Sequence, residues 1–223
     1  MVTSPYLASP YRYLLERVLP SFIPKGAKVI LDYGCGSGIY RHWFTWETYV
    51  GVDTDNRFKW RDVFIVADGK NLPFPNGIFD LVLCNAVLEH IKEDVQAVKE
   101  IHRVLKLRGA VIVGVPSIFT YTFTLGRHGH HYYTKKVIKR LIETQGFIIE
   151  KAESLGGLIS LMLATVRTLY LTQKKGRVVK EDSRRIGISR KNRVYIMVLQ
   201  LTAKIDRLLR LTPGGYILLA KKS

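Results

Sequence analysis

The chain has 223 residues, of which 47% are hydrophobic and 24% charged, and a formal net charge of +17. This composition excludes a disordered protein and fits one domain with a sizeable core. The two cysteines, Cys35 and Cys84, exclude a disulfide scaffold, and they lack the C-x-x-C spacing of zinc-ribbon or thiol-redox sites. The first twenty residues contain no apolar signal segment, so we expect a protein of the reducing cytoplasm.

The positive charge is unevenly distributed along the chain. Residues 157–212 contain 13 basic and 3 acidic side chains, whereas residues 1–156 contain 20 basic and 15 acidic ones. A basic segment of this kind suits nucleic acid, anionic lipid headgroups or an acidic substrate. Composition does not choose among these three classes of partner.

The first two thirds of the chain alternate short apolar runs with helical patterns. Strands are expected at 28–32, 49–53, 64–67, 79–84 and 111–115, and a helix over 94–105 is expected to end in the cations and glycine of 106–109. Further on, Thr134 predicts the N-cap of a helix that Gly146 ends, and strands are expected at 147–152 and 216–220. Alternation of strands and helices is typical of an α/β fold with a parallel sheet.

Between the last two strands lies a basic insertion, defined here as residues 157–213. Its first part, 157–173, is apolar but contains Arg167, and it is too short for a confident transmembrane helix. Residues 174–193 are predicted to be a basic linker, and residues 194–211 an amphipathic helix. We therefore expect two units, a main domain of residues 1–156 plus 214–223, and the insertion.

A glycine loop is the strongest site signal. The first predicted strand ends in Asp32-Tyr33-Gly34-Cys35-Gly36-Ser37-Gly38, ahead of an expected helix. Glycines permit a tight turn and close approach of the backbone to a ligand. Asp53 ends the second strand, where a carboxylate can accept hydrogen bonds from a ribose diol. Asp68 ends the third, a place suited to an adenine amino group.

The motifs together resemble those of class I S-adenosylmethionine-dependent methyltransferases. The D-x-G-x-G-x-G loop, VGVD up to Asp53, the LPF-x-x-x-x-FD stretch ending at Asp80 and the V-L-E-H turn ending at His90 follow in the family's order. The resemblance covers residues 28–153 and 214–222, and it is closest to the subgroup that modifies small molecules, lipids and sugars. It implies a Rossmann-like, seven-stranded, mostly parallel sheet with helices on both faces and an antiparallel last strand. The helical insertion before that strand is expected from the sequence pattern, because the resemblance covers it poorly.

The resemblance also implies the cofactor, S-adenosylmethionine, and a set of residues that would bind it: Asp32, Gly34, Cys35, Gly36, Gly38, Asp53, Thr54, Ala67, Asp68 and Asn85. Tyr33 departs from the pattern, because a small or aliphatic residue is usual at its position. The competing hypothesis is a nicotinamide-dependent dehydrogenase. Its fingerprint is G-x-G-x-x-G, whereas the glycines here alternate, and Asp32 would repel a pyrophosphate.

The sequence offers two candidate catalytic histidines. His90 is a candidate base for removing a proton from a hydroxyl acceptor, and its alternative role is a structural one beside Glu89. His131 belongs to the segment 127–134, which resembles the acceptor-side loop of glycan-modifying relatives and is otherwise a solvated loop. No metal is expected there, because no carboxylate or cysteine accompanies the histidines.

The expected activity is methyl transfer from S-adenosylmethionine to a small or lipid-linked acceptor, first an oxygen of a sugar or glycan intermediate. The alternatives are C- or O-methylation of a prenylated quinone or other lipid, RNA methylation, and a module that binds the cofactor without turnover. For the insertion, the alternatives are a membrane-surface element that meets anionic headgroups at the inner face of the membrane, and a lid over the acceptor. Nucleic acid is disfavoured, because the insertion has only Tyr170 and Tyr195 for base stacking.

Overall fold

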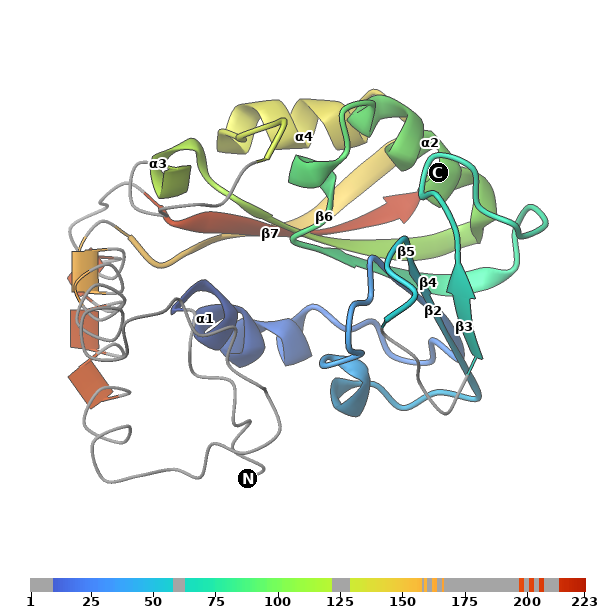
Figure 1. Cartoon of the computed structure of the whole chain (residues 1–223), viewed down its shortest axis with the longest axis horizontal. Coiled ribbons are helices and arrows are strands. Elements are labelled where there is room, and N and C mark those ends of the chain that lie inside the picture. Colours follow the sequence, from blue (N-terminus) through green and yellow to red (C-terminus); the bar gives the residue numbers. More distant parts are fainter. Residues whose placement is uncertain are drawn as a thin grey trace.

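A seven-stranded sheet forms the centre of the protein (Figure 1). The computed structural model describes residues 10–57, 63–121, 129–157 and 213–223, and positions 159, 162, 163, 166, 197, 198, 201, 202, 205 and 206 of the insertion. The strands are β1 Val29–Tyr33, β2 Thr48–Asp53, β3 Val63–Val66, β4 Phe79–Asn85, β5 Leu105–Pro116, β6 Phe147–Leu155 and β7 Gly215–Lys222. All seven predicted strands are confirmed, with ends that differ by a few residues.

The sheet has the order β3-β2-β1-β4-β5-β7-β6. Neighbours from β3 to β5 run parallel, and β7 lies antiparallel to both β5 and β6. The predicted Rossmann-like topology with an antiparallel last strand is therefore confirmed. The strand order reverses between β1 and β4, and ligands of open α/β sheets bind beside such a reversal, at the carboxyl ends of the strands.

Helices cover both faces of the sheet (Figure 1). On one face, α1 (Pro10–Val18) and the 3-10 turn Leu19–Ser21 pack on one set of alternating strand residues, which includes Ile30, Leu81 and Ile112. On the other face, α2 (Asp94–Val104) and α4 (Lys135–Glu143) pack on the other set, which includes Leu31, Val82 and Val111. A short helix, α3 (Ile118–Tyr121), follows β5. Helix α4 is capped as predicted, because the Thr134 hydroxyl accepts a hydrogen bond from the Val137 amide (3.3 Å).

Two predicted elements differ in the structure. After the glycine loop the chain forms a 3-10 turn, Arg41–Trp43, in place of the expected helix. The connection to β2 is short, and its aromatic residues Tyr40 and Phe44 are buried against the α1 face, so tertiary packing decides its conformation. The predicted helix over 94–105 ends at Val104, because residues 106–109 extend β5 and the Val104 carbonyl accepts from Ile78 (2.9 Å).

The insertion begins and ends at the carboxyl edge of the sheet. Leu155, at the end of β6, pairs with Gly215, at the start of β7, which also pairs with Pro116 at the end of β5. Within the insertion, the buried Asp206 carboxylate accepts a hydrogen bond from the Ile159 amide (2.9 Å), so its two ends are joined. The predicted linker 174–193 lies outside the described residues. Among the helices that the structure describes, none has the length and apolar character needed to cross a membrane.

Candidate functional site

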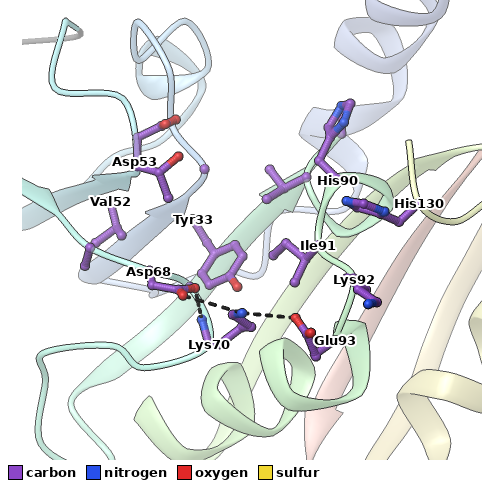
Figure 2. Close-up of a pocket in the computed structure, with 16 residues that line it drawn as sticks. Tyr33, Val52, Asp53, Asp68, Lys70, His90, Ile91, Lys92, Glu93 and His130 are labelled. Atoms are coloured by element: carbon purple, nitrogen blue, oxygen red, sulfur yellow. Dashed lines mark hydrogen bonds and ion pairs between the residues drawn. The ribbon is translucent and has the colours of Figure 1, made fainter. Parts of the chain in front are cut away.

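A cavity of about 550 Å³ opens at the carboxyl ends of β1, β2 and β4, beside the reversal in strand order (Figure 2). Five of the ten predicted cofactor residues line it: Gly34, Asp53, Thr54, Ala67 and Asp68. Other residues of its wall are Tyr33, Lys70, Val87, Glu93 and His130. The cavity therefore lies where the motifs predicted a site.

Gly34 has two reasons to be glycine. Its φ of +69° lies in the left-handed region, and a Cβ built there would be 2.3 Å from the Cγ2 atom of Val87. Its amide and that of Cys35 donate to the Val52 carbonyl at 2.8 and 3.0 Å. The glycine loop is thus fixed to the end of β2 and lies against the loop that follows β4.

Asp53 connects the end of β2 to the glycine loop. Its Oδ2 accepts a hydrogen bond from the Gly36 amide (2.8 Å), and its Oδ1 accepts one from the Asp55 amide (3.0 Å). Each carboxylate oxygen can accept more than one hydrogen bond. Asp53 can therefore hold the loop and also accept from two neighbouring hydroxyls of a ligand in the cavity.

A chain of charged groups forms the wall contributed by the loop after β3 (Figure 2). The Asp68 Oδ1 accepts from the Lys70 amide (2.9 Å), and the Lys70 ammonium lies 3.0 Å from Glu93 and 3.7 Å from Asp68. The hydrogen bond and charge of Lys70 lower the pKa of Glu93. The motifs assign no role to Lys70 or Glu93, so the sequence did not indicate this pair.

Asp32 faces away from the cavity. It is buried on the α1 face of the sheet and accepts a hydrogen bond from the Tyr49 hydroxyl (2.8 Å). Burial raises the pKa of Asp32 to about 7, a rise that the Tyr49 bond opposes and the charge of Asp53 reinforces. Its contact with the methionine end of a cofactor remains a prediction.

The other four predicted cofactor residues also lie outside the cavity wall. Cys35 is buried, and this burial raises the pKa of its thiol. Asn85 donates a hydrogen bond to the Tyr40 hydroxyl (2.9 Å). Gly36 and Gly38 both have positive φ values, which the sharp turn of the loop requires.

Two imidazoles lie at the end of the cavity opposite Asp68, those of His90 and His130 (Figure 2). His90 belongs to the 3-10 turn Leu88–His90, and its Nε2 lies 3.9 Å from the Glu89 carboxylate. The amides of His130 and His131 donate to the Glu89 carbonyl at 2.6 and 3.2 Å. A Cβ on Gly129 would be 2.9 Å from that carbonyl oxygen, so the close approach of this segment favours glycine.

His131, the second of the two predicted catalytic histidines, is not in the cavity wall. Its Nε2 lies 2.8 Å from the Lys92 carbonyl oxygen, which can only accept, so this nitrogen carries a hydrogen. The sequence singled out the segment 127–134 but not which of its histidines faces the cavity, because that depends on the contact with Glu89. Among the described residues, no group of three or more histidine, cysteine or acidic side chains is placed to hold a metal ion.

Comparison with known proteins agrees with this geometry. Residues 31–113 match the family described as "Methyltransferase domain". An uncharacterized protein of Methanocaldococcus jannaschii is 37% identical over 105 residues (45% of this chain, 46% of the relative), and an uncharacterized methyltransferase of Mycobacterium leprae is 31% identical over 119 residues (48% and 42%). The chain therefore spans less than half the length of these curated relatives.

A ubiquinone/menaquinone biosynthesis C-methyltransferase of Coxiella burnetii is 38% identical over 50 residues, 22% of this chain and 20% of that protein. Among solved structures, a SAM dependent methyltransferase from Archaeoglobus fulgidus has a TM-score of 0.61 at 20% identity, over 96% of this chain and 95% of that one. The cavity between the glycine loop, Asp53 and Asp68 thus occurs in a known fold. Residues 31–113 thus match a methyltransferase domain, and the chain has the fold of a solved SAM dependent methyltransferase, as its motifs predicted.

Proposed function

We propose that the protein transfers a methyl group from S-adenosylmethionine to a small or lipid-linked acceptor, in the first place to an oxygen of a sugar or glycan intermediate. The observation that carries this proposal is the cavity itself. Asp53 and Asp68 lie in one part of its wall, and the imidazoles of His90 and His130 lie at the far end (Figure 2). A nucleoside site and a proton acceptor would thus share one cavity.

The residues present fit the implied cofactor. Gly34 lets the glycine loop lie directly against Val87 in the cavity wall, because a Cβ there would clash with the Val87 side chain. Three carboxylates line the cavity, those of Asp53, Asp68 and Glu93, and they suit hydroxyl and amino groups but would repel a pyrophosphate. When bound, S-adenosylmethionine supplies a methyl group made electrophilic by its cationic sulfur.

The protein's own part in such a transfer is alignment, exclusion of water and removal of a proton. Asp53 and Asp68 would fix the nucleoside, and the acceptor hydroxyl would enter near the two histidines. His90 is the first candidate base, because it lines the cavity, and its Nε2 lies 3.9 Å from the Glu89 carboxylate. His130 is the second, and its position depends on the backbone contact with Glu89.

The insertion supports a lipid-linked acceptor. Both of its ends leave the sheet at the carboxyl edge, the edge that holds the cavity. Its described residues include exposed apolar side chains, at Met162, Val166, Met197 and Leu201, and its sequence contains 13 basic residues. Exposed apolar side chains in a segment of basic sequence suit an anionic membrane surface, so we propose that the insertion is both a lid and a membrane contact.

A prenylated quinone is the second candidate acceptor. The short similarity to the Coxiella burnetii quinone methyltransferase favours it, and a quinone intermediate would also suit an apolar lid at a membrane. Methylation at carbon and methylation at oxygen both need a group that removes a proton, so the histidines do not separate the two acceptors.

Transfer of a labelled methyl group to extracts tests the proposal. The protein is incubated with methyl-tritiated S-adenosylmethionine and with separate lipid, soluble-glycan and RNA fractions, and Asp53→Ala is the control that should lose binding. We expect label in the lipid fraction, released into water by mild acid if a lipid-linked sugar carries it and retained if a quinone does. His90→Gln and His130→Gln then show which imidazole turnover needs. Label in RNA would overturn the proposed acceptor, and no label with any fraction would overturn the activity.

A further inference from the structure

The hydroxyl of Tyr33 is buried at the cavity wall without a hydrogen-bond partner among the described residues. The side chain is only 1% exposed. Two comparable buried tyrosines do have partners, since Tyr49 donates to Asp32 (2.8 Å) and Tyr133 donates to Asp94 (2.9 Å). A buried hydroxyl without a partner destabilises a protein, so this one calls for a ligand that would complete it.

The neighbours of Tyr33 show which part of the cavity its hydroxyl faces. A Cβ on Gly69 would be 2.0 Å from the Tyr33 hydroxyl oxygen and 2.4 Å from Cζ, so the loop that carries Asp68 lies directly against this end of the ring. Figure 2 shows the hydroxyl end of Tyr33 pointing toward the wall formed by Asp68 and Lys70. The tyrosine thus lines the part of the cavity that the motifs assign to adenine.

The hydroxyl is a donor at any physiological pH. Burial, followed by the charges of Cys84, Asp68 and Glu100, raises the pKa of Tyr33 far above its ordinary value. The same wall therefore presents one hydrogen-bond donor, Tyr33, and one acceptor, Asp68. Adenine has the complementary edge, an amino group that donates beside a ring nitrogen that accepts.

We infer that Tyr33 determines specificity for the base of the cofactor: its hydroxyl donates to a ring nitrogen next to the adenine amino group, while Asp68 accepts from the amino group. The inference rests on the proposed use of S-adenosylmethionine. It gives a reason for a tyrosine where the family usually has a small or aliphatic residue, and for the glycine at position 69 that makes room for it. A base with an oxygen in place of the amino group would lose both hydrogen bonds, the one donated by Tyr33 and the one accepted by Asp68.

The test is calorimetric binding of S-adenosylhomocysteine to the wild type and to Tyr33→Phe. We expect the variant to bind about tenfold more weakly, because a buried acceptor on the base loses its donor, and to melt at an unchanged or higher temperature without ligand. Tyr216→Phe is the matched control, since Tyr216 is buried in the same apolar cluster on β7 but is not in the cavity wall. It should keep wild-type affinity.

Analogues of S-adenosylhomocysteine that lack one ring nitrogen, the 1-deaza and 7-deaza compounds, identify the partner atom. One of them should lose about tenfold in affinity for the wild type and nothing further for Tyr33→Phe. Equal affinity of both proteins for S-adenosylhomocysteine would overturn the inference while leaving the proposed function intact, as would equal penalties of the analogues in both proteins. Binding to neither folded protein would overturn the proposed function as well.

Discussion

Asp32 and Tyr33 are consecutive residues of β1 that serve opposite faces of the sheet. Strand side chains alternate, so Tyr33 reaches the cavity among the residues under α2, whereas Asp32 is buried against Tyr49 on the α1 side. The carboxyl group of Asp32 is only 2% exposed and accepts a hydrogen bond from the Tyr49 hydroxyl. Burial to this extent favours the protonated form of a carboxyl group over the charged form. The free energy of unfolding therefore depends on pH through Asp32.

Replacing Asp32 with asparagine is expected to remove a pH-dependent part of the stability. The pKa of Asp32 is raised in the folded protein from 3.8 to about 7, so its stabilising contribution is complete below pH 4 and is lost as the pH rises through 7. Between pH 5 and pH 8 the loss should be about 2–3 kcal/mol. The asparagine amide of the variant would keep an acceptor for Tyr49 but cannot ionise.

The measurement is the free energy of unfolding in urea of the ligand-free wild type and Asp32→Asn at several pH values. As the pH rises from 5 to 8, the free energy of unfolding of the variant should increase relative to that of the wild type. Comparing two proteins at each pH cancels the titration of every other group. Parallel pH profiles would mean that Asp32 is ionised in the folded protein, and the expected linkage would be wrong.

How much of the site could be predicted depends on where each residue lies. Gly34, Asp53 and Asp68 lie at or just after the carboxyl ends of parallel strands, which meet at one edge of a sheet, so their meeting was predictable. The positions of Tyr33, Lys70 and His130 depend on which strand face, which loop and which backbone contact brings them to the cavity. No local pattern encodes those contacts.

The same distinction holds for secondary-structure elements. The strands were predictable because each is a short apolar run between turn residues, and α4 because Thr134 and Gly146 mark its ends. The missing helix after Gly38 was not, because tertiary burial of Tyr40 and Phe44 overrides local pattern. The ends of elements are also fixed by distant partners, and Asp80 on β4 is the clearest example.

Asp80 joins the starts of three strands. Its Oδ2 accepts from the amides of Lys28 and Val29 at 3.0 and 2.8 Å, and its Oδ1 accepts from the Lys106 ammonium (2.7 Å). Partial burial opposes ionisation, but Lys106 and the two amides outweigh it and lower the pKa of Asp80. Its contribution is therefore present above the ordinary carboxyl pKa and is lost in acid.

Asp80→Ala should destabilise the sheet without touching the cavity. We expect a loss of about 2–3 kcal/mol in the free energy of unfolding at pH 7, because three hydrogen bonds to one carboxylate disappear. Affinity for S-adenosylhomocysteine should stay the same, since Asp80 lies at the amino end of β4 and the cavity at its carboxyl end.

The control for Asp80 is Glu150→Ala, which removes an exposed ion pair with Lys221 (2.7 Å) between β6 and β7. Exposed pairs contribute about 0–1 kcal/mol, so urea unfolding should separate the two variants clearly. Similar losses of unfolding free energy in both variants would show that Asp80 contributes no more to stability than an exposed ion pair does.

At the scale of the whole molecule, the +17 charge is mainly a property of the insertion. The insertion is joined at its base, where Asp206 accepts from the Ile159 amide (2.9 Å) and a Cβ on Gly157 would be 2.5 Å from the Asp206 Cγ. Both ends of the insertion leave the sheet at its carboxyl edge, the edge that holds the cavity. The proposed membrane contact would place this edge of the sheet beside a membrane surface, where a lipid-linked acceptor is held.

Vesicle flotation tests the membrane contact. The wild type should float with vesicles that contain phosphatidylglycerol and much less with pure phosphatidylcholine, because basic side chains near an anionic surface contribute about 1 kcal/mol each. Replacing Met162 and Val166, 52% and 64% exposed, with aspartate should abolish flotation, since it removes apolar area and adds negative charge.

Leu107→Asp is the matched control for the flotation experiment, because Leu107 is 73% exposed on β5 and belongs to no part of the insertion. It should float like the wild type. If the variant with aspartate at positions 162 and 166 floats as well as the wild type, the insertion does not contact the membrane. It would then act only as a lid, and its basic residues would act on the acceptor. That outcome would direct the search to soluble anionic acceptors, since a basic lid without a membrane would still attract a phosphate-bearing sugar.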